Sequence, residues 1–134
     1  MLLVKTKIGL SKIHGIGLFA DQFIPQGMPV WEFTDGFDME YTAEDLERLS
    51  EPARAQFLHY CYLDPDTRRY VLCTDDARFC NHSETPTTIN PDPAGPDIAS
   101  RDIQPGEELT YDYRTGDVDY TRKLGLWASK AKLS

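Results

Sequence analysis

The sequence lacks any long apolar run. None of its 134 residues belongs to a stretch that approaches the ~20 apolar residues a membrane-spanning helix requires. The apolar stretch within residues 1–7 is also too short for a signal peptide. We therefore expect no membrane partner. We expect a soluble intracellular protein, either cytoplasmic or exported to a host by a route that the sequence does not reveal.

Cysteine and histidine are scarce, with three residues of each type. The cysteines, Cys61, Cys73 and Cys80, form no CxxC pair. Their odd number and spacing argue against a zinc ribbon or a disulfide framework and are typical of a reducing compartment. The histidines do not form an HxxxH pair either. We therefore expect no metal site, and a metal-dependent hydrolase is the remotest alternative function.

Positive charge is also in short supply. The chain has 22 Asp and Glu residues against 14 Lys and Arg, a formal net charge of −8 at pH 7. We expect no direct nucleic-acid partner, because binding to a phosphate backbone relies on Lys and Arg. An acidic surface would instead attract a basic protein. The charge alone is equally compatible with a soluble acidic protein that has no such partner.

Short strands separated by turns account for most of the chain. β-Branched and apolar residues predict strands over residues 2–8, 16–20, 30–33 and 70–73. Residues 24–27 have the Pro and Gly of a tight turn. Residues 98–103 and 109–113 flank a second Pro-Gly turn and form a hairpin candidate. Residues 85–97 contain four prolines and predict an irregular loop.

One helical insertion is expected at about residues 42–59. Thr42 is a plausible N-cap, and Ser50, followed by Pro52 in the first turn, predicts the start of a second short helix. The fold class is therefore mostly β with some helix, α+β at most. Leu46 and Leu49 of the first helix would face the core, and so would Ala53, Phe57 and Tyr60, or a close set, in the second.

Three segments carry residues suited to chemistry, and the first is His14-Gly15-Ile16-Gly17. Its two glycines have no Cβ atom and would let a ligand approach the backbone closely. It is not a dinucleotide fingerprint, because the third glycine is missing and Leu18-Phe19-Ala20 continues as a strand. An ordinary β-turn explains the same pair of glycines.

The second segment, residues 78–83, places Asn81 beside His82. These side chains could recognise an adenine edge and an amine, but an Asx-turn with a packed histidine explains them as well. The third segment, residues 106–113, would direct Tyr111 and Tyr113 to one face of a strand, where two phenols could line an aromatic slot. Half-buried tyrosines of an ordinary strand are the alternative.

In this order and spacing, the three segments resemble the SET-domain protein-lysine methyltransferases. The resemblance runs from about Lys12 to Tyr113, roughly three quarters of the chain. It implies a β-clip fold of small β-sheets with a pseudoknot and a short helical insertion. It also implies S-adenosyl-L-methionine as the cofactor and methyl donor.

The resemblance assigns site residues too. The family's catalytic tyrosine matches Tyr113, and Tyr111 stands where the family varies between Tyr and Phe. A Tyr at that position implies mono- or dimethylation. The positions that match the family's cofactor-binding residues are His14, Gly15, Ile16, Gly17, Tyr60, Asn81, His82 and Tyr113.

The chain departs from many relatives in having no cysteine-rich segment before the core and no cysteine after Cys80. It therefore resembles a minimal bacterial or viral member without pre-SET and zinc-binding post-SET segments. We expect a SET domain over residues 1–116 and a tail over residues 117–134 that packs near the active site. Tyr120, Leu124 and Trp127 of this tail are the residues expected to close the substrate channel.

The sequence thus predicts a protein-lysine N-methyltransferase acting on a basic protein, such as a histone, a DNA-packaging protein or a ribosomal protein. A non-catalytic SET-like module that binds a peptide or cofactor is the first alternative. A structural or assembly domain is the second, and it would oligomerise without affinity for S-adenosylmethionine.

Overall fold

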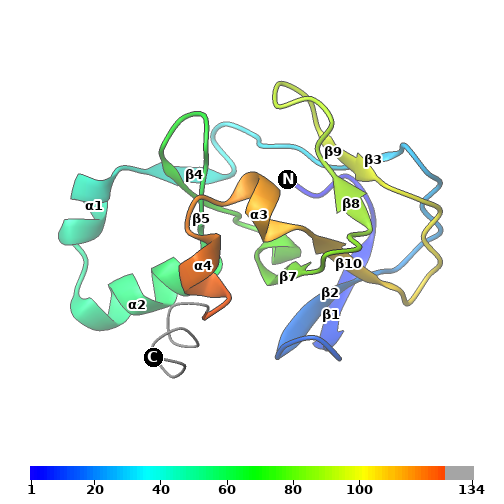
Figure 1. The fold of residues 1–134 in the computed structure, drawn as a ribbon, viewed down its shortest axis with the longest axis horizontal. Helices are drawn as coiled ribbons and strands as arrows, with labels where there is room; N and C mark the ends of the chain where they lie inside the picture. The colour runs from blue at the N-terminus through cyan, green and yellow to red at the C-terminus, as the bar shows by residue number, and fades with distance from the viewer. Residues whose placement is uncertain (126–134) are drawn as a thin grey trace. The chain divides into compact units, whose positions relative to one another are not determined.

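The computed structural model describes residues 1–125, which form two compact units (Figure 1). The first unit comprises residues 1–39 and 73–112. The second comprises residues 40–72 and the chain from residue 113 onward. Small β-sheets with a few short helices make up both units, which confirms the expected fold class. No described helix has the length and apolar character needed to cross a membrane.

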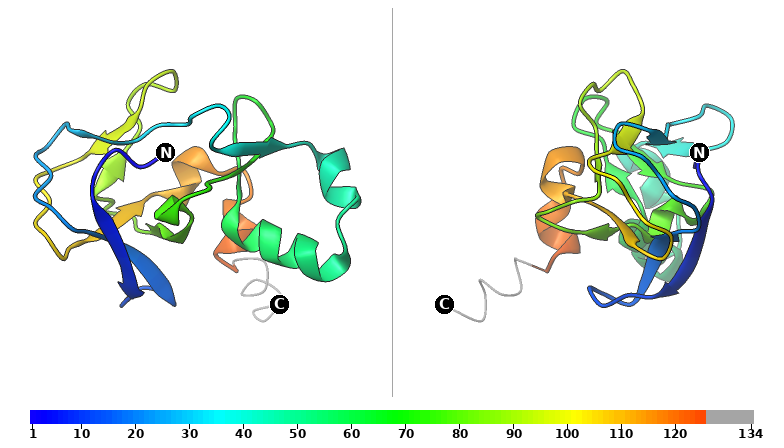
Figure 2. Two further views of the ribbon diagram at one scale, coloured as in Figure 1. Left: turned by 180° about the vertical axis from the view of Figure 1, so that it is seen from behind. Right: turned by 90° about the vertical axis from the view of Figure 1, so that its right-hand side faces the viewer.

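A four-stranded sheet forms the larger part of the first unit. Its strand order is β1 (Thr6–Leu10), β2 (Ile16–Ala20), β10 (Glu108–Tyr111) and β7 (Asn81–His82). The hairpin of β1 and β2 is the blue pair of arrows in Figures 1 and 2. Strand β10 runs antiparallel to β2 and parallel to β7. The sheet therefore joins the three chemically notable segments of the sequence, which are far apart along the chain.

The second sheet of this unit has the order β3 (Pro29–Trp31), β9 (Asp97–Ala99) and β8 (Thr88–Ile89). The hairpin predicted for residues 98–103 and 109–113 is therefore wrong, because β9 and β10 belong to different sheets. The chain crosses between the sheets through the turn at Gly106, whose φ is +89°. Residues 85–97 are not wholly irregular either, since they contain β8.

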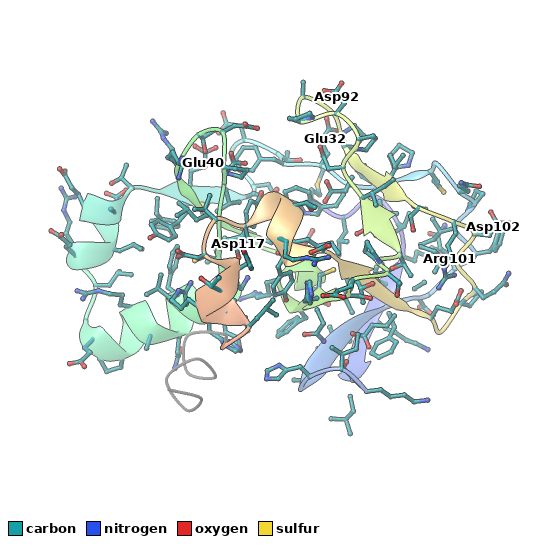
Figure 3. All side chains as sticks on the ribbon, in the orientation of Figure 1. Glu32, Glu40, Asp92, Arg101, Asp102 and Asp117 are labelled. Atoms are coloured by element: carbon teal, nitrogen blue, oxygen red, sulfur yellow. The ribbon has the colours of Figure 1, made fainter. Side chains whose placement is uncertain are left out.

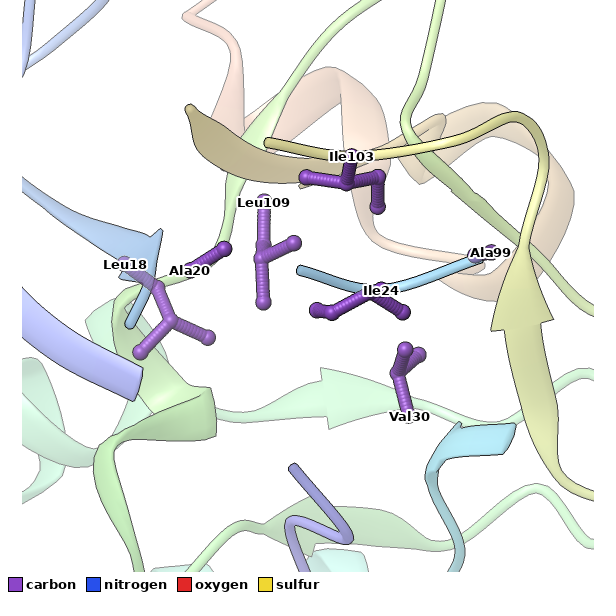
Figure 4. Close-up of a cluster of buried hydrophobic side chains, with 7 residues drawn as sticks. All are labelled: Leu18, Ala20, Ile24, Val30, Ala99, Ile103 and Leu109. Atoms are coloured by element: carbon purple, nitrogen blue, oxygen red, sulfur yellow. The ribbon is translucent and has the colours of Figure 1, made fainter. Parts of the chain in front are cut away.

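The core of the first unit lies between these strands. Leu18 and Leu109 come from neighbouring strands, and Ile24 and Ile103 form an isolated antiparallel bridge, with all four side chains buried (Figure 4). The predicted turn after Ile24 is present, with Met28 N–H donating to Pro25 O at 3.1 Å. Seven residues make up the buried cluster: Leu18, Ala20, Ile24, Val30, Ala99, Ile103 and Leu109.

The second unit combines a small sheet with helices. The sheet has the order β4 (Met39–Tyr41), β6 (Tyr70–Leu72) and β5 (Tyr62–Leu63), and Met39 is the last residue of the first unit's opening segment. The predicted pair of helices is confirmed as α1 (Ala43–Glu47) and α2 (Glu51–Tyr60).

The caps explain why the chain forms two helices here. Thr42 Oγ1 accepts from Asp45 N–H at 3.2 Å, and Asp45 Oδ2 accepts from Thr42 N–H at 2.8 Å. These bonds lower the pKa of the Asp45 carboxyl. Ser50 caps α2 by accepting from Ala53 N–H at 3.3 Å. The second helix therefore begins within one turn of the end of the first.

The predicted inner face of α2 is partly wrong. Ala53 is exposed, whereas Phe57 and Tyr60 are half-buried. Phe57 packs edge-to-face on Tyr41 of β4, with ring centroids 4.8 Å apart. Arg54 faces inward instead of Ala53, because its guanidinium donates to the carbonyl groups at the C-terminal end of α1, including Leu46 O at 2.9 Å. Leu46 O also accepts from Leu49 N–H at 3.2 Å.

Three short helices remain: η1 (Asp76–Phe79) in the first unit, and α3 (Tyr113–Gly116) and α4 (Tyr120–Lys123) in the second. Asp117 follows α3 directly and is labelled beside it in Figure 3. Its Oδ1 accepts from Leu63 N–H at 3.0 Å, and the neighbouring Val118 N–H donates to Leu63 O at 2.9 Å. The segment between α3 and α4 is thus attached to strand β5.

Candidate functional site

The glycine segment connects β1 to β2 as a tight, exposed loop. Ser11 N–H donates to Gly15 O at 2.8 Å, and Ser11 Oγ accepts from Ile13 N–H at 2.9 Å. Gly15 has a φ of +47°, a left-handed conformation that favours glycine. His14, Gly15 and Ile16 are exposed. The three residues therefore lie at the surface of the first unit, and the cofactor-binding role that the resemblance gives them stays a prediction.

The carboxylate of Glu108 on β10 anchors this loop through hydrogen bonds. It accepts from Ser11 Oγ–H at 2.8 Å and from Asn81 Nδ2–H at 3.1 Å. A Cβ placed on Gly17 would lie 2.8 Å from Glu108 Oε2 and 3.0 Å from Ser11 Cβ. Gly17 is therefore required by the packing of the carboxylate, whereas Gly15, with nothing within 4 Å of such a Cβ, is required by its φ.

Asn81 joins the loop to the neighbouring strands. Its Nδ2 lies 3.0 Å from His14 O, 3.3 Å from Ile16 O and 3.1 Å from Glu108 Oε2. An amide NH₂ group has two hydrogens for these three acceptors. The side chain is buried, so it fixes the spacing between the two carbonyl groups of the loop.

Strand pairing fixes the position of His82. The parallel ladder of β7 and β10 sets Asn81 opposite Thr110 and His82 opposite Tyr111. His82 Nδ1 lies 3.7 Å from Asp112 Oδ1, and Ser83 N–H donates to Tyr111 O at 3.1 Å. The first unit therefore brings Asn81, His82 and Tyr111 together with the glycine loop.

Buried threonines join β10 to the segment around β8. Thr87 N–H donates to Thr110 Oγ1 at 3.1 Å, and Thr110 N–H donates to Thr87 Oγ1 at 2.9 Å. Thr88 Oγ1–H donates to Thr110 O at 2.8 Å. These bonds satisfy backbone groups of β10 from a segment that its prolines had marked as a loop. The threonine repeat at Thr87-Thr88 was the available signal.

The two tyrosines of the third segment are not on one strand face. Tyr111 is the last residue of β10, whereas Tyr113 is the first residue of α3 and belongs to the second unit. The prediction that both tyrosines lie on one strand face is wrong, because β10 ends at Tyr111, two residues before Tyr113. Tyr60, at the end of α2, is also in the second unit, where its ring meets His59 with centroids 4.8 Å apart.

Sequence reasoning missed a charged cluster beside Tyr113 in the second unit. Lys123 Nζ lies 4.6 Å from the centroid of the Tyr113 ring and 3.3 Å from Asp117 Oδ2. It also donates to Cys61 O at 2.9 Å. No sequence motif marked Lys123 or Asp117. Of the tail residues named from the sequence, Tyr120 and Leu124 are partly buried, and Trp127 lies outside the described residues.

Two of the three cysteines, Cys61 and Cys73, are not suited to nucleophilic chemistry. Burial raises the pKa of the Cys61 thiol to about 11 and that of the Cys73 thiol to about 12. Both thiols are therefore protonated at neutral pH, and a thiolate is the reactive form. Cys80 Sγ donates to Leu109 O at 3.3 Å within the sheet. Among the described residues, no three His, Cys, Asp or Glu side chains are placed to hold a metal ion.

Solved structures share this fold. Chaetomium thermophilum Polycomb Repressive Complex 2 bound to GSK126 matches with a TM-score of 0.63 and 24% identity, over 90% of this chain and 17% of that one. A structure of ctPRC2 in an autoinhibited conformation, bound to S-adenosylmethionine, matches with a TM-score of 0.58 and 23% identity, over 90% of this chain and 16% of that one.

Sequence comparisons identify relatives among curated proteins. A histone-lysine N-methyltransferase of Mycosarcoma maydis, H3 lysine-4 specific, is 33% identical over 118 residues, which is 81% of this chain and 8% of the relative. A Plasmodium falciparum relative is 29% identical over 125 residues, which is 85% of this chain and 2% of the relative. The chain thus spans a small part of these curated proteins. The family model for the SET domain matches residues 15–114, and the chain belongs to the SET domain family, whose methyltransferases use S-adenosylmethionine.

Proposed function

We propose that this chain is an S-adenosylmethionine-dependent protein-lysine N-methyltransferase. One observation carries the proposal: the glycine loop is tied through Asn81 and Glu108 to the strand that leads to Tyr113. Membership of the SET domain family supports lysine methylation as the reaction.

The residues of the loop fit the cofactor. His14, Gly15 and Ile16 are exposed residues whose backbone groups Asn81 and Ser11 hold in place, and the left-handed Gly15 leaves open space where a side chain would stand. Backbone groups of this kind suit the charged amino-acid end of S-adenosylmethionine. We assign cofactor binding to this loop with Gly17, Asn81 and His82, and we keep Tyr60 and Tyr113 as further predicted contacts. When bound, the cofactor supplies an electrophilic methyl group on a sulfonium.

The chain's own task is to present a neutral amine. A free lysine has a pKa near 10.4, so its deprotonation at pH 7 costs about 4 to 5 kcal/mol. A desolvated aromatic surrounding disfavours the ammonium and lowers that pKa. In our proposal the Tyr113 hydroxyl orients the substrate amine and Tyr111 limits the space around it. Holding the reacting groups in line removes several further kcal/mol from the barrier.

The substrate is proposed to be a basic protein. The net charge of −8 favours the approach of a lysine-rich segment, such as a histone tail, a DNA-packaging protein or a ribosomal protein. Because Tyr111 carries a hydroxyl, we expect mono- and dimethyl-lysine to dominate the products. A product spectrum dominated by trimethyl-lysine would contradict that expectation.

Mass spectrometry of a panel of basic proteins, incubated with the protein and S-adenosylmethionine, tests the function. We expect methyl-lysine with the wild type and a loss of at least about 100-fold in Tyr113→Phe, in the range that positioned catalytic groups contribute. Tyr41→Phe is the matched control. This variant also loses a phenol hydroxyl, but the Tyr41 ring packs on Phe57, outside the predicted site. Tyr41→Phe should therefore keep the wild-type activity.

Cofactor binding is measured in parallel by calorimetry. Tyr113→Phe should still bind S-adenosylmethionine, because the glycine loop is unchanged. Near-normal turnover of this variant would overturn the assignment of Tyr113. Cofactor binding by the wild type, without methylation of any protein in a broad panel, would favour the non-catalytic module. A wild type that neither binds S-adenosylmethionine nor methylates any protein would overturn the proposed function.

A further inference from the structure

Lys123 places an ammonium group in the interior of the second unit. Its side chain is only 10% exposed, although it belongs to the last turn of the short helix α4. Three partners surround the ammonium: the carbonyl oxygen of Cys61, the carboxylate of Asp117 and the ring of Tyr113. The neighbouring Arg122, in contrast, is 39% exposed and forms an i,i+3 ion pair with Asp119.

Asp117 holds that ammonium in a fixed position. Its side chain is fully buried, and its Oδ1 accepts from Leu63 N–H at 3.0 Å and from Asp119 N–H at 2.9 Å. Its own N–H donates to Tyr113 O at 3.0 Å. Asp117 therefore bonds to the backbone of Tyr113 and also holds Lys123, whose ammonium contacts the Tyr113 ring.

A buried ion pair is a weak source of stability, because two charges lose their hydration. A tether for α4 alone would be made equally well by apolar side chains. The particular consequence of an ammonium here is its contact with an aromatic face, where the ring quadrupole attracts a cation and fixes its geometry. That ring belongs to the residue that matches the family's catalytic tyrosine.

We propose that Lys123 is a positioning residue for Tyr113, held in place by Asp117. The inference rests on the proposed function, since it concerns the tyrosine assigned to act on the substrate amine. The ammonium restricts the movement of the whole Tyr113 side chain and so fixes the position of its hydroxyl. A displacement of about 1 Å in such a group can cost on the order of 100-fold in rate.

The experiment compares three variants in full-length protein: Lys123→Met, Lys123→Arg and Arg122→Met. Met keeps the length and apolar stem of lysine without the charge, Arg restores a cation that can stack on the ring, and Arg122→Met removes a neighbouring cation of the same helix. For each variant we would measure thermal unfolding, the dissociation constant for S-adenosylmethionine, and kcat and KM on a lysine peptide identified with the wild type.

We expect kcat of Lys123→Met to fall at least about tenfold, with cofactor affinity and peptide KM within about threefold of the wild type. Lys123→Arg should recover most of the loss, and Arg122→Met should match the wild type. A looser tyrosine should also change the ratio of mono- to dimethyl-lysine in Lys123→Met. A purely structural contact would not alter that ratio.

Wild-type turnover in Lys123→Met would overturn the inference and leave the proposed function intact. So would a kcat loss that Lys123→Arg does not recover, or one that only follows a loss of folded protein or of cofactor affinity. If Lys123→Met does not fold, Lys123→Arg decides by itself. Its kcat and product ratio must stay close to those of the wild type. A wild type that methylates nothing overturns the proposed function and this inference together.

Discussion

Each unit of the molecule holds a segment of the proposed site around a carboxylate, but the two carboxylates have different partners. In the first unit, Glu108 accepts from the neutral Ser11 hydroxyl and Asn81 amide. In the second unit, Asp117 faces the ammonium of Lys123 and accepts from two backbone N–H groups. The first arrangement shapes a backbone loop, whereas the second fixes side chains.

The difference teaches where each unit is sensitive. Hydrogen bonds from neutral donors to a carboxylate contribute about 1.5 to 3 kcal/mol each and can be replaced by water when the loop is partly exposed. A buried charge that loses its partner cannot be hydrated, and the loss is larger. We therefore expect the second unit to depend on charge and the first to depend on close packing.

The largest expected effect breaks the charge pair of the second unit. Asp117→Asn keeps an oxygen that can accept from Leu63 and Asp119 N–H but removes the negative charge opposite Lys123. The free energy of unfolding should fall by about 3 kcal/mol, because a buried ammonium is left without its counter-charge. Thermal and denaturant unfolding followed by circular dichroism would measure it.

Asp119→Asn provides the matched control two residues away. Asp119 is 28% exposed and pairs with Arg122 along the surface of α4. Its replacement should cost less than about 1 kcal/mol, as surface ion pairs do. Equal losses for Asp117→Asn and Asp119→Asn would show that charge burial does not distinguish the Asp117 cluster.

A smaller effect tests close packing in the first unit. Gly17→Ala should lower the free energy of unfolding by about 2 kcal/mol, because the new Cβ would lie 2.8 Å from Glu108 Oε2. Gly15→Ala meets no atom within 4 Å and should cost only about 1 kcal/mol, for its left-handed backbone. The affinity for S-adenosylmethionine should also fall further in Gly17→Ala than in Gly15→Ala.

A double variant separates the two causes. Adding Glu108→Ala removes the carboxylate that the Cβ of Ala at position 17 would meet, so Gly17→Ala should cost less in that background. The same addition should leave the cost of Gly15→Ala unchanged. Equal costs of Gly17→Ala in both backgrounds would rule out the clash with the Glu108 carboxylate as its cause.

Local signals made the helices and the glycine loop predictable from the sequence. Thr42 and Ser50 mark both helix starts through side-chain bonds to residues three positions on, and Gly15 marks a left-handed turn. Long-range contacts were not predictable. Strand β9 pairs with the distant β3 as well as with the preceding β8, and both partners of β10 are non-local. The side chain of Lys123 meets a carbonyl 62 residues earlier in the chain.

The strand that was expected to continue to Tyr113 shows the same limit. Tyr-Asp-Tyr alternates as a strand should, but β10 ends at Tyr111. Asp117 N–H then bonds to Tyr113 O, which closes the helical turn of α3. The family resemblance assigns Tyr113 by its position in the motif, and that assignment stays a prediction. Periodicity alone could not tell where the strand stops.

The smallest expected effect is the pH dependence that one buried thiol in each unit gives to the free energy of unfolding. Burial raises the pKa of Cys61, in the second unit, to about 11 and that of Cys73, in the first, to about 12. In the unfolded chain both thiols ionise near pH 9 or slightly below. The folded state therefore binds more protons at alkaline pH. The stability from burying neutral thiols is present below about pH 9 and declines as the pH rises towards the folded pKa values.

Between pH 9 and 10, each thiol should lower the free energy of unfolding by about 1 kcal/mol. Urea unfolding at several pH values would compare the wild type with Cys61→Ala and Cys73→Ala. Each variant should show a shallower alkaline decline than the wild type, and the Cys73 contribution should persist to higher pH than that of Cys61. Identical slopes for wild type and variants would mean that the thiols do not ionise on unfolding in this range. Because the two thiols lie in different units, a decline that disappears in only one variant would identify the unit whose opening limits stability at alkaline pH.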